Sequence, residues 1–328
     1  MTGVTARVPA KVNLQLAVGS PRADGFHDLV TVFHAVSLFD QVTVKPAARD
    51  AVTVTGEDVG RVPVGQDNLA LRAVAALRAA VPDGGTGTRG VQVTIAKRIP
   101  VAAGLAGGSA DAAAALVACN QLWATGLSQQ QLCEVGATVG SDVAFALLGG
   151  TAVGRGRGEQ LTPALVPATQ YHWVLAFADG QLATPEVFTA LDRLRASRGG
   201  RGGKVSPQEQ GGREGDRPPG RTPPGLDASL MSALRAGDAR LVGSRLSNDL
   251  QPAALSLFPA LRKTLAAGLE LGALGALVAG SGPTCAFLAA SAERALELAV
   301  AMSGAGVCRS VARVTGPAPG AAVVSAQT

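Results

Sequence analysis

The sequence has few charged residues and lacks the patterns that are typical of exported, membrane-spanning or zinc-binding proteins. Charged residues make up 16% of its 328 residues and hydrophobic residues 47%, so one large domain or two ordinary ones can form a core. No apolar run reaches the length of a membrane span, and no signal segment opens the chain, which predicts an unexported protein. The four cysteines form no CxxC pair, which favours free thiols in a reducing cytoplasm.

Residues 196–225 contain no aromatic residue and have no apolar periodicity. Six Lys or Arg against three Asp or Glu place +3 of the net charge of +5 in this glycine- and proline-rich segment. Such a composition cannot bury enough surface to offset its ordering entropy, so we expect a disordered insertion. An RNA-binding tail is the alternative, but nothing in the segment can stack on bases. We therefore expect neither a nucleic-acid partner nor a membrane partner.

Apolar periodicity divides the rest of the chain into strands and helices. The strands are expected at 42–46, 51–56, 91–100, 171–178, 275–280, 284–289 and 308–314. The helices are expected at 67–80, 109–123, 128–139 and near 185–195, 227–236, 238–246, 259–268 and 291–303. Because no regular strand–helix–strand repeat is present, the pattern favours an α+β fold. The turn-rich stretch at 155–165 suggests a boundary and thus two domains, 1–160 and 161–328.

Between a predicted strand and a predicted helix lies the glycine-rich stretch "IPVAAGLAGGSAD" at 99–111. It has neither the lysine of a Walker A loop nor the GxGxxG spacing of a dinucleotide site. Gly104, Gly107 and Gly108 would nevertheless allow a ligand to approach the backbone, and the following helix begins with unpaired N–H groups that attract phosphate. Ser109 would cap this helix or turn its hydroxyl to a phosphate. A tight turn without a ligand is the alternative.

Three other places carry polar groups that could belong to a site. Lys11 and Asn13 lie one residue apart, so on a strand they share a face. His27 follows a turn, and Asp142 lies in an apolar, glycine-flanked stretch where it either caps a short helix or acts as a base. The turn at 280–283 would suit a ligand or the first glycine loop, or would be an ordinary hairpin turn. Alone, Lys11 and His27 are also compatible with exposed polar surface.

Together these stretches resemble the GHMP kinase superfamily. Three motifs carry the resemblance in the family's order, namely "PAKVNLQL", "PVAAGLAGGSADAAAAL" and "GSGPTCAF". The similarity covers nearly the whole chain, apart from 196–225 and the last dozen residues. It implies a two-domain α+β fold with an N-terminal ribosomal-protein-S5-domain-2-like domain and a C-terminal ferredoxin-like α/β domain.

Within the superfamily, "PAKVNLQLAVGSPRADGFHDL", "VGSDVAFAL", "ATPEVF" and "NDLQP" are similar to kinases of the non-mevalonate isoprenoid pathway. The resemblance implies phosphoryl transfer from ATP, with bound Mg²⁺, to the 2-hydroxyl of a cytidine-diphosphate-linked methylerythritol. It makes Asp142 the general base and Lys11 the group that stabilises charge, and it leaves the protein ligand of the metal unassigned, with Ser109 as the first candidate. The ATP phosphates would be held by Pro100, Val101, Ala102, Ala103, Gly104, Leu105, Ala106, Gly107, Gly108, Ser109 and Ala110.

The resemblance also implies a site for the cytidine. His27 would recognise the polar edge of cytosine, Phe26 and Phe188 would stack on its faces, and Asn13 and Thr184 would bind other polar groups of the substrate. The family usually has Tyr where this chain has Phe26, which keeps the ring. The alternatives are another GHMP kinase, of the homoserine or mevalonate type, and a non-catalytic nucleotide- or RNA-binding module. We expect a cytoplasmic monomer or weak homodimer.

Overall fold

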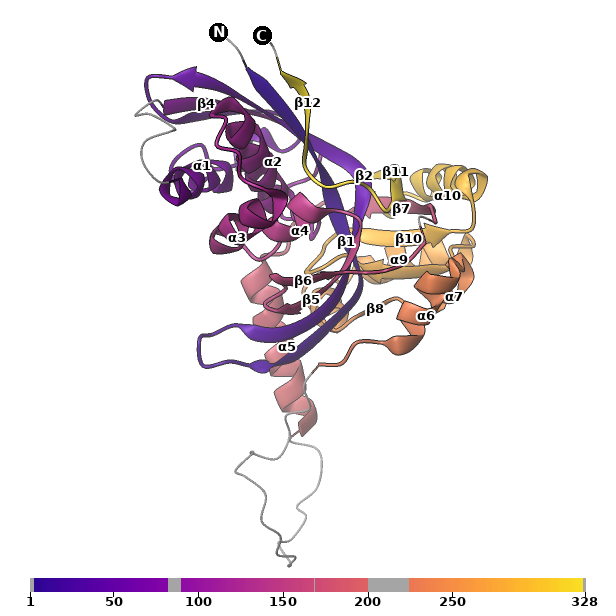
Figure 1. Ribbon diagram of the computed structural model, residues 1–328. Helices are drawn as coiled ribbons and strands as arrows, with labels where there is room; N and C mark the ends of the chain where they lie inside the picture. Colours follow the sequence, from indigo (N-terminus) through magenta and orange to yellow (C-terminus); the bar gives the residue numbers. More distant parts are fainter. Residues whose placement is uncertain (1–2, 82–89, 168, 200–223, 327–328) are drawn as a thin grey trace, which may run out of the picture.

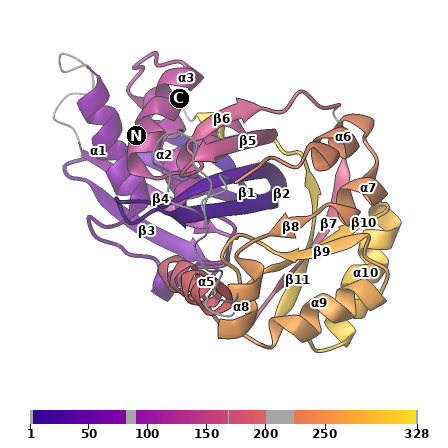
Figure 2. The same ribbon diagram turned by 90° about the horizontal axis from the view of Figure 1, so that it is seen from below.

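The computed structural model describes residues 3–81, 90–167, 169–199 and 224–326, which form two β-sheets with helices packed against them. Figures 1 and 2 show the two sheets and their helices as neighbouring halves of the molecule. Most of the predicted insertion, from 200 to 223, lies outside the described residues. Within the described part, no helix combines the length and the apolar character that crossing a membrane requires.

The first sheet has eight strands among the described residues, with the central order β12-β1-β2-β4-β3. On its other branches, β5 pairs with β2 and β6, and β8 pairs with β1. The strands are β1 (Val4–Pro21), β2 (His27–Ala47), β3 (Ala51–Gly56), β4 (Gly90–Lys97), β5 (Thr151–Gly156), β6 (Gln160–Pro163), β8 (Ser247–Asn248) and β12 (Ala322–Ala326). Its core is one antiparallel hairpin of β1 and β2, which also carries Lys11 and Asn13.

The sequence patterns predicted only the far end of β2 and missed β1. Residues 8–16 of β1 are all buried, on both faces of the sheet. A strand that is buried on both faces has no alternation of apolar and polar residues, so its period cannot be recognised. The missed strand β1 is therefore one of the most buried parts of the fold.

Four helices pack beside the first sheet, and the second of them approaches it closely because it is rich in alanine. They are α1 (Leu69–Ala80), α2 (Gly107–Leu122), α3 (Gln129–Val139) and α4 (Val143–Leu148), and the short 3-10 helix η1 (Val59–Arg61) precedes α1. Residues 112–115 of α2 are four alanines with no exposed surface. Alanine favours the helix, and its small side chain lets α2 lie directly on β1 and β2, where it positions the loop that precedes it.

The second sheet is antiparallel in the order β11-β7-β10-β9. Its strands are β7 (Tyr171–Phe177), β9 (Gly275–Val278), β10 (Cys285–Ala289) and β11 (Ser310–Gly316). The helices of this half are α5 (Thr184–Gly199), α6 (Ala228–Ala236), α7 (Ala239–Ser244), α8 (Gln251–Leu257), α9 (Leu261–Glu270) and α10 (Ala292–Gly304). Alternate residues of β7 face two hydrophobic cores. Trp173 and Leu175 belong to the large core shared with the first sheet, while Val174 and Ala176 pack in a second core with α9 and α10.

Several predicted boundaries differ from the structure. The strand expected at 91–100 ends at Lys97, and the following helix begins at Gly107 rather than 109. Helix α8 was not predicted, and the turn-rich stretch at 155–165 is the β5–β6 hairpin of the first sheet. Helix α5 continues to Gly199, so the first residues of the predicted insertion are helical. The domain division at 160 stays a prediction; β6 crosses it, and β12 returns to β1.

A buried histidine lies where the two sheets meet. His34 on β2 has no exposed surface, and its Nδ1 lies 2.9 Å from the hydroxyl of Thr151. Its ring packs against Tyr171 and Trp173 of β7, at centroid distances of 5.7 and 6.0 Å. Burial disfavours the charged imidazolium and lowers the pKa of His34 to about 3.

We predict that His34 makes the protein less stable as the pH falls. In the unfolded chain, His34 binds a proton once the pH falls below its ordinary pKa of 6.5. In the folded chain, it binds one only near pH 3. In that window the free energy of unfolding therefore decreases with falling pH, by at most about 1.4 kcal/mol per pH unit from this one group. Urea unfolding of the wild type and of His34→Gln at several pH values measures this slope. The half-buried His172 provides the control His172→Gln, and an unchanged slope in His34→Gln would contradict the prediction.

Candidate active site

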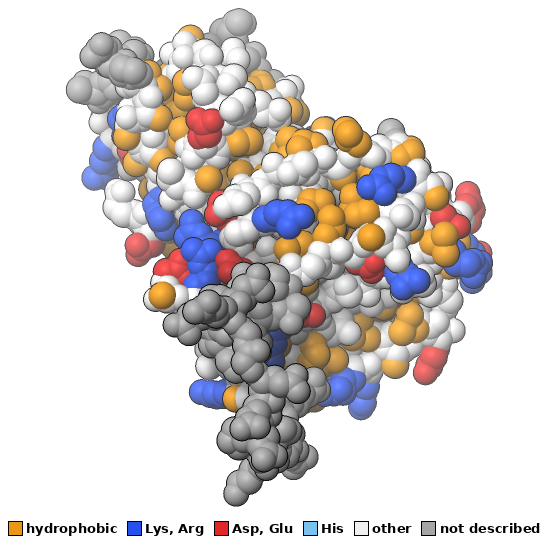
Figure 3. Space-filling view, turned by 60° about the horizontal axis from the view of Figure 1, so that its bottom comes forward, with side chains coloured by type: hydrophobic (Ala, Val, Ile, Leu, Met, Phe, Trp, Pro, Cys, Tyr) orange, Lys and Arg blue, Asp and Glu red, His pale blue; other side chains and the backbone are white. Residues whose placement is uncertain are grey.

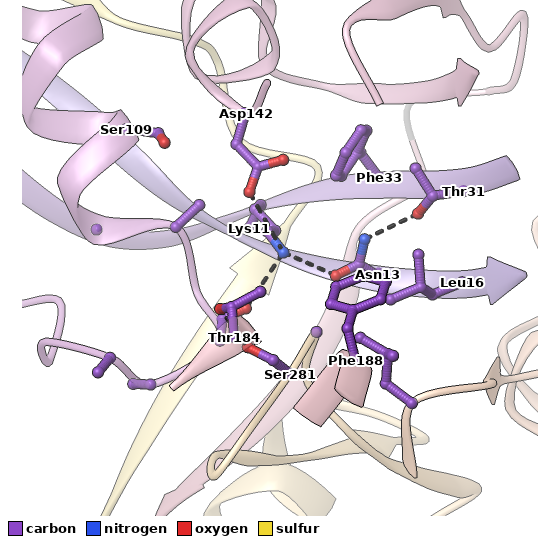
Figure 4. A pocket seen from close by; sticks show the side chains of 17 residues that line it. Lys11, Asn13, Leu16, Thr31, Phe33, Ser109, Asp142, Thr184, Phe188 and Ser281 are labelled. Carbon is purple, nitrogen blue, oxygen red and sulfur yellow. Dashed lines mark hydrogen bonds and ion pairs between the residues drawn. The ribbon is translucent and has the colours of Figure 1, made fainter. Parts of the chain in front are cut away.

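A cavity of about 300 Å³ opens between the β1–β2 hairpin, the glycine-rich loop before α2 and the turn between β9 and β10. Figure 4 shows it with Lys11 at its centre. It is lined by Lys11, Asn13, Leu16, Thr31, Phe33, Ala102, Ala103, Gly104, Ala106, Gly107, Ser109, Asp142, Thr184, Phe188, Leu250, Gly280 and Ser281. Segments that are far apart in the chain thus converge on one space.

Lys11 contacts groups from its own strand, from the glycine-rich loop and from the residue before α4. Its ammonium lies 3.8 Å from the Asp142 carboxylate and donates to the Asn13 side-chain oxygen at 2.8 Å and to the Gly104 carbonyl at 3.2 Å. Asn13 in turn donates to the hydroxyl of Thr31 on β2. Lys11 is buried, so it is not the solvated edge charge that its sequence context also allowed. This network fixes a positive charge beside a carboxylate at the floor of the cavity.

The Asp142 side chain is free to face the cavity. Its backbone is the N-cap of α4, but its side chain makes no hydrogen bond to the first turn of that helix. The alternative that this carboxylate serves as a helix cap is therefore wrong. In Figure 4 one of its oxygens points toward Lys11, and the side chain keeps 30% of its surface exposed. A carboxylate with this access can accept a proton from a bound molecule.

Two carboxylates outside the cavity determine which amides of the glycine-rich loop are available. The N–H groups of Arg98 and Ile99 donate to Asp40, and that of Val101 donates to Asp58. From 102 to 106 no backbone N–H of the loop has a partner in the described structure, and 107–109 are the free N–H groups of the first helical turn. The free donors thus begin at 102 and end at 109.

The loop gains its shape from backbone that turns repeatedly into the left-handed region. Ala102, Gly104 and Ala106 have φ values of 52°, 77° and 60°. Successive N–H groups in such a turn form a concave surface that attracts anions. Ala106 is the N-cap of α2, so the prediction that Ser109 caps this helix is wrong. Ser109 lies in the first helical turn instead and contributes to the cavity wall.

The glycine-rich loop touches the turn between β9 and β10, and glycines make this contact possible. A Cβ on Gly104 would lie 2.0 Å from the Ala279 carbonyl oxygen, and one on Gly280 would lie 2.8 Å from the Gly104 oxygen. Both positions require glycine because backbone occupies the space of a side chain. The 280–283 turn is thus a hairpin turn between the antiparallel strands β9 and β10, and it also contacts the first glycine loop.

Beneath the loop lies a buried ion cluster. The Lys97 ammonium contacts Asp40 at 2.5 Å and Asp111 at 2.9 Å, and all three side chains are buried. Burial opposes the charge of Lys97, but the two carboxylates outweigh it and raise its pKa. Burial, together with repulsion from Asp40, raises the pKa of Asp111 despite the attraction of Lys97. The raised pKa of Asp111 favours its protonated form.

The polar groups expected to bind the rest of a substrate are only partly brought together. Thr184 and Phe188, both on α5, line the cavity, and the Thr184 hydroxyl lies 2.9 Å from that of Ser281. His27 does not line the cavity, but its ring lies 4.9 Å from that of Phe188. Phe26 is 51% exposed with the Arg157 guanidinium over its ring, and it is not part of the cavity wall.

The residues of the glycine-rich loop are likewise only partly in the cavity wall. Five of the residues predicted for the phosphates do not line the cavity: Pro100, Val101, Leu105, Gly108 and Ala110. Leu105 is buried and Ala110 already donates to the Ala106 carbonyl. The cavity wall also contains four residues that the sequence motifs did not single out, namely Leu16, Thr31, Phe33 and Leu250. Only Thr31, a polar residue in an apolar strand, gave a signal that could have been noticed.

Comparison with known proteins defines the class first. The model for the GHMP kinases N terminal domain matches residues 68–150, and that for GHMP kinases C terminal matches 230–308. The fold with its glycine loop is thus that of a GHMP kinase.

A kinase from Thermobifida fusca, 4-diphosphocytidyl-2-C-methyl-D-erythritol kinase, is 52% identical over 98% of this chain and 99% of its own length. The enzyme of the same name from Mycolicibacterium smegmatis is 50% identical over 98% and 93%. A crystal structure of 4-(cytidine 5'-diphospho)-2C-methyl-D-erythritol kinase matches with a TM-score of 0.69 and 32% identity, over 94% of this chain and 98% of that one. This chain belongs to the 4-diphosphocytidyl-2-C-methyl-D-erythritol kinase family, and it is a phosphotransferase with an alcohol group as acceptor.

We predict that replacing Lys97 with an uncharged residue destabilises the protein much more than replacing Asp111. Lys97→Met leaves Asp40 and Asp111 buried without a cation, which should lower the free energy of unfolding by about 3–5 kcal/mol. Asp111→Asn replaces a carboxyl whose raised pKa favours the protonated, uncharged form, so it should cost less than about 1 kcal/mol. Urea unfolding at neutral pH measures both values. Equal losses in the two variants would show that Asp111 is ionised in the folded protein.

Proposed function

We propose that this protein transfers the γ-phosphoryl group of ATP to the 2-hydroxyl of 4-diphosphocytidyl-2-C-methyl-D-erythritol, a step of the non-mevalonate isoprenoid pathway. The observation that carries the proposal is the 3.8 Å approach of Lys11 and Asp142 beside a loop of free amides. A base, a cation and a phosphate site in one cavity are the parts that phosphoryl transfer requires. The names of the similar kinases supply the substrate.

Asp142 would accept the proton of the substrate hydroxyl as that oxygen attacks phosphorus. Lys11 would hold the Asp142 carboxylate in place and would offset the negative charge that develops on the attacking oxygen. The amides of 102–109 would hold the ATP phosphates. Mg²⁺ fits this arrangement because it prefers oxygen ligands and is usually held by substrate phosphates with few protein groups; Ser109 would be its protein contact, and the ion would neutralise phosphate charge.

The cytidine would lie toward α5 and the start of β2. Phe188 lines the cavity there, and His27 packs beside it. Stacking of a base on an aromatic ring contributes about 1–3 kcal/mol. Asn13 and Thr184, both in the cavity wall, would bind polar groups between the base and the reacting hydroxyl. Phe26 would join the stack from its exposed position on the hairpin turn.

The alternatives have less support. A kinase for homoserine or mevalonate would have no use for the paired rings of His27 and Phe188. A nucleic-acid-binding module would be expected to gather its basic side chains in a patch or stripe. On the face that Figure 3 shows, Lys and Arg side chains are scattered among acidic and apolar ones.

A coupled assay of ADP release tests the proposed substrate. With ATP and Mg²⁺, the purified protein should turn over 4-diphosphocytidyl-2-C-methyl-D-erythritol with a kcat/KM at least about a thousand times that for homoserine or mevalonate, because only the first substrate can occupy the cytidine site. Turnover of either small alcohol at a comparable kcat/KM would overturn the proposal.

A second experiment tests the role of Asp142. Asp142→Asn keeps the size of the side chain but cannot accept the proton, so kcat should fall by about 10²–10⁴. Binding of both substrates, measured by calorimetry, should change less than about threefold. Glu270→Gln, an exposed change of the same kind far from the cavity, provides the control. A variant that keeps wild-type kcat would exclude Asp142 as the base.

A further inference from the structure

A carboxylate on helix α5 contacts the histidine that the proposed function places at the cytosine. Asp192 Oδ1 lies 3.0 Å from His27 Nε2. The His27 ring also packs on Phe188, which lies one turn earlier than Asp192 on the same helix. His27 is buried, whereas Asp192 keeps 37% of its side chain exposed. Helix α5 therefore determines both the position and the orientation of this imidazole.

We propose that Asp192 is a positioning residue that makes the enzyme select cytosine over uracil, by fixing the proton of His27 on Nε2. The inference rests on the proposed function, since it concerns the base that His27 would meet. A carboxylate can only accept a hydrogen bond, so the nitrogen that faces it must carry the hydrogen. In the neutral ring the other nitrogen, Nδ1, is then an acceptor.

An acceptor at Nδ1 distinguishes the two pyrimidines by their exocyclic groups. Cytosine carries an amino group at C4, which donates, whereas uracil carries a carbonyl oxygen there, which accepts. Against the Nδ1 lone pair, cytosine forms a hydrogen bond and uracil places two acceptors together. Loss of the Asp192 contact frees the imidazole to move its proton to Nδ1, which suits uracil instead.

The first test observes the proton directly and needs no activity. The chain has only three histidines, so ¹⁵N labelling of histidine gives a spectrum with three imidazoles. In the wild type at neutral pH, His27 should show the neutral form protonated at Nε2. In Asp192→Ala this signal should move toward a mixture of tautomers, while the signals of His34 and His172 stay in place. An imidazolium or an Nδ1-protonated His27 in the wild type would overturn the proposal.

The second test compares kcat/KM for 4-diphosphocytidyl-2-C-methyl-D-erythritol and for its uridine-diphosphate counterpart. Asp192→Ala should lower the ratio of cytidine to uridine substrate by about tenfold or more, while KM for ATP stays within about twofold. Glu186→Gln, which removes an exposed carboxylate from the same helix, should leave the ratio unchanged. Asp192→Asn is a second variant with a nearly isosteric side chain and should also lower the ratio.

The two tests separate this inference from the proposed function. If the wild type does not phosphorylate the cytidine substrate, the proposed function is wrong, and the ¹⁵N spectrum still decides whether Asp192 fixes the His27 proton. If the wild type is active and both Asp192 variants keep the wild-type ratio, the proposed function stands and the role of Asp192 in selectivity is wrong.

Discussion

The buried contact of Lys97 with Asp40 and Asp111 is the constraint on which the glycine-rich loop depends. Lys97 is the last residue of β4, Asp40 lies on β2 and Asp111 on α2, so one ammonium joins the two ends of the glycine-rich loop to the central sheet. The second oxygen of Asp40 accepts the first two amides of the loop. Because both ends are held, the amides between them are oriented before any ligand arrives, and binding need not order them. Gly107 lies directly on Lys97, where a Cβ would come within 3.0 Å of Nζ.

The cavity exists because two sheets with different roles meet at this loop. The first sheet supplies Lys11 and Asn13 on β1, where burial keeps them rigid. The second half supplies the turn at 279–283, whose glycines allow backbone to approach backbone, and α5, which carries Thr184 and Phe188. Neither half encloses the space alone. The packing of His34 against β7 belongs to the same junction, so the stability of the junction and the geometry of the cavity have a common origin.

Carboxylates outside the cavity also pair with some of the polar groups around it and not with others. Asp40 and Asp58 occupy the amides at one end of the loop and leave those from 102 onward for a ligand. Asp192 occupies one nitrogen of His27 and leaves the other. In both places a carboxylate pairs with one group and not with its neighbour, and a donor that is already paired is not available to a ligand. A sequence motif cannot identify such side chains, since their effect depends on the atom that they face.

The sequence by itself determined the α+β class, the helices of strong periodicity and the residues of the central motif, because propensity and spacing are local properties. It also singled out Lys11 and Asp142, which the fold brings to 3.8 Å across more than a hundred residues of chain. It could not determine β1, whose burial on both faces removes the alternation, nor which loop amides stay free, nor that Phe26 lies outside the cavity wall while His27 meets Asp192. Those outcomes were decided by the tertiary structure. Each depends on a partner that is distant in the chain and on how the packing orients that partner.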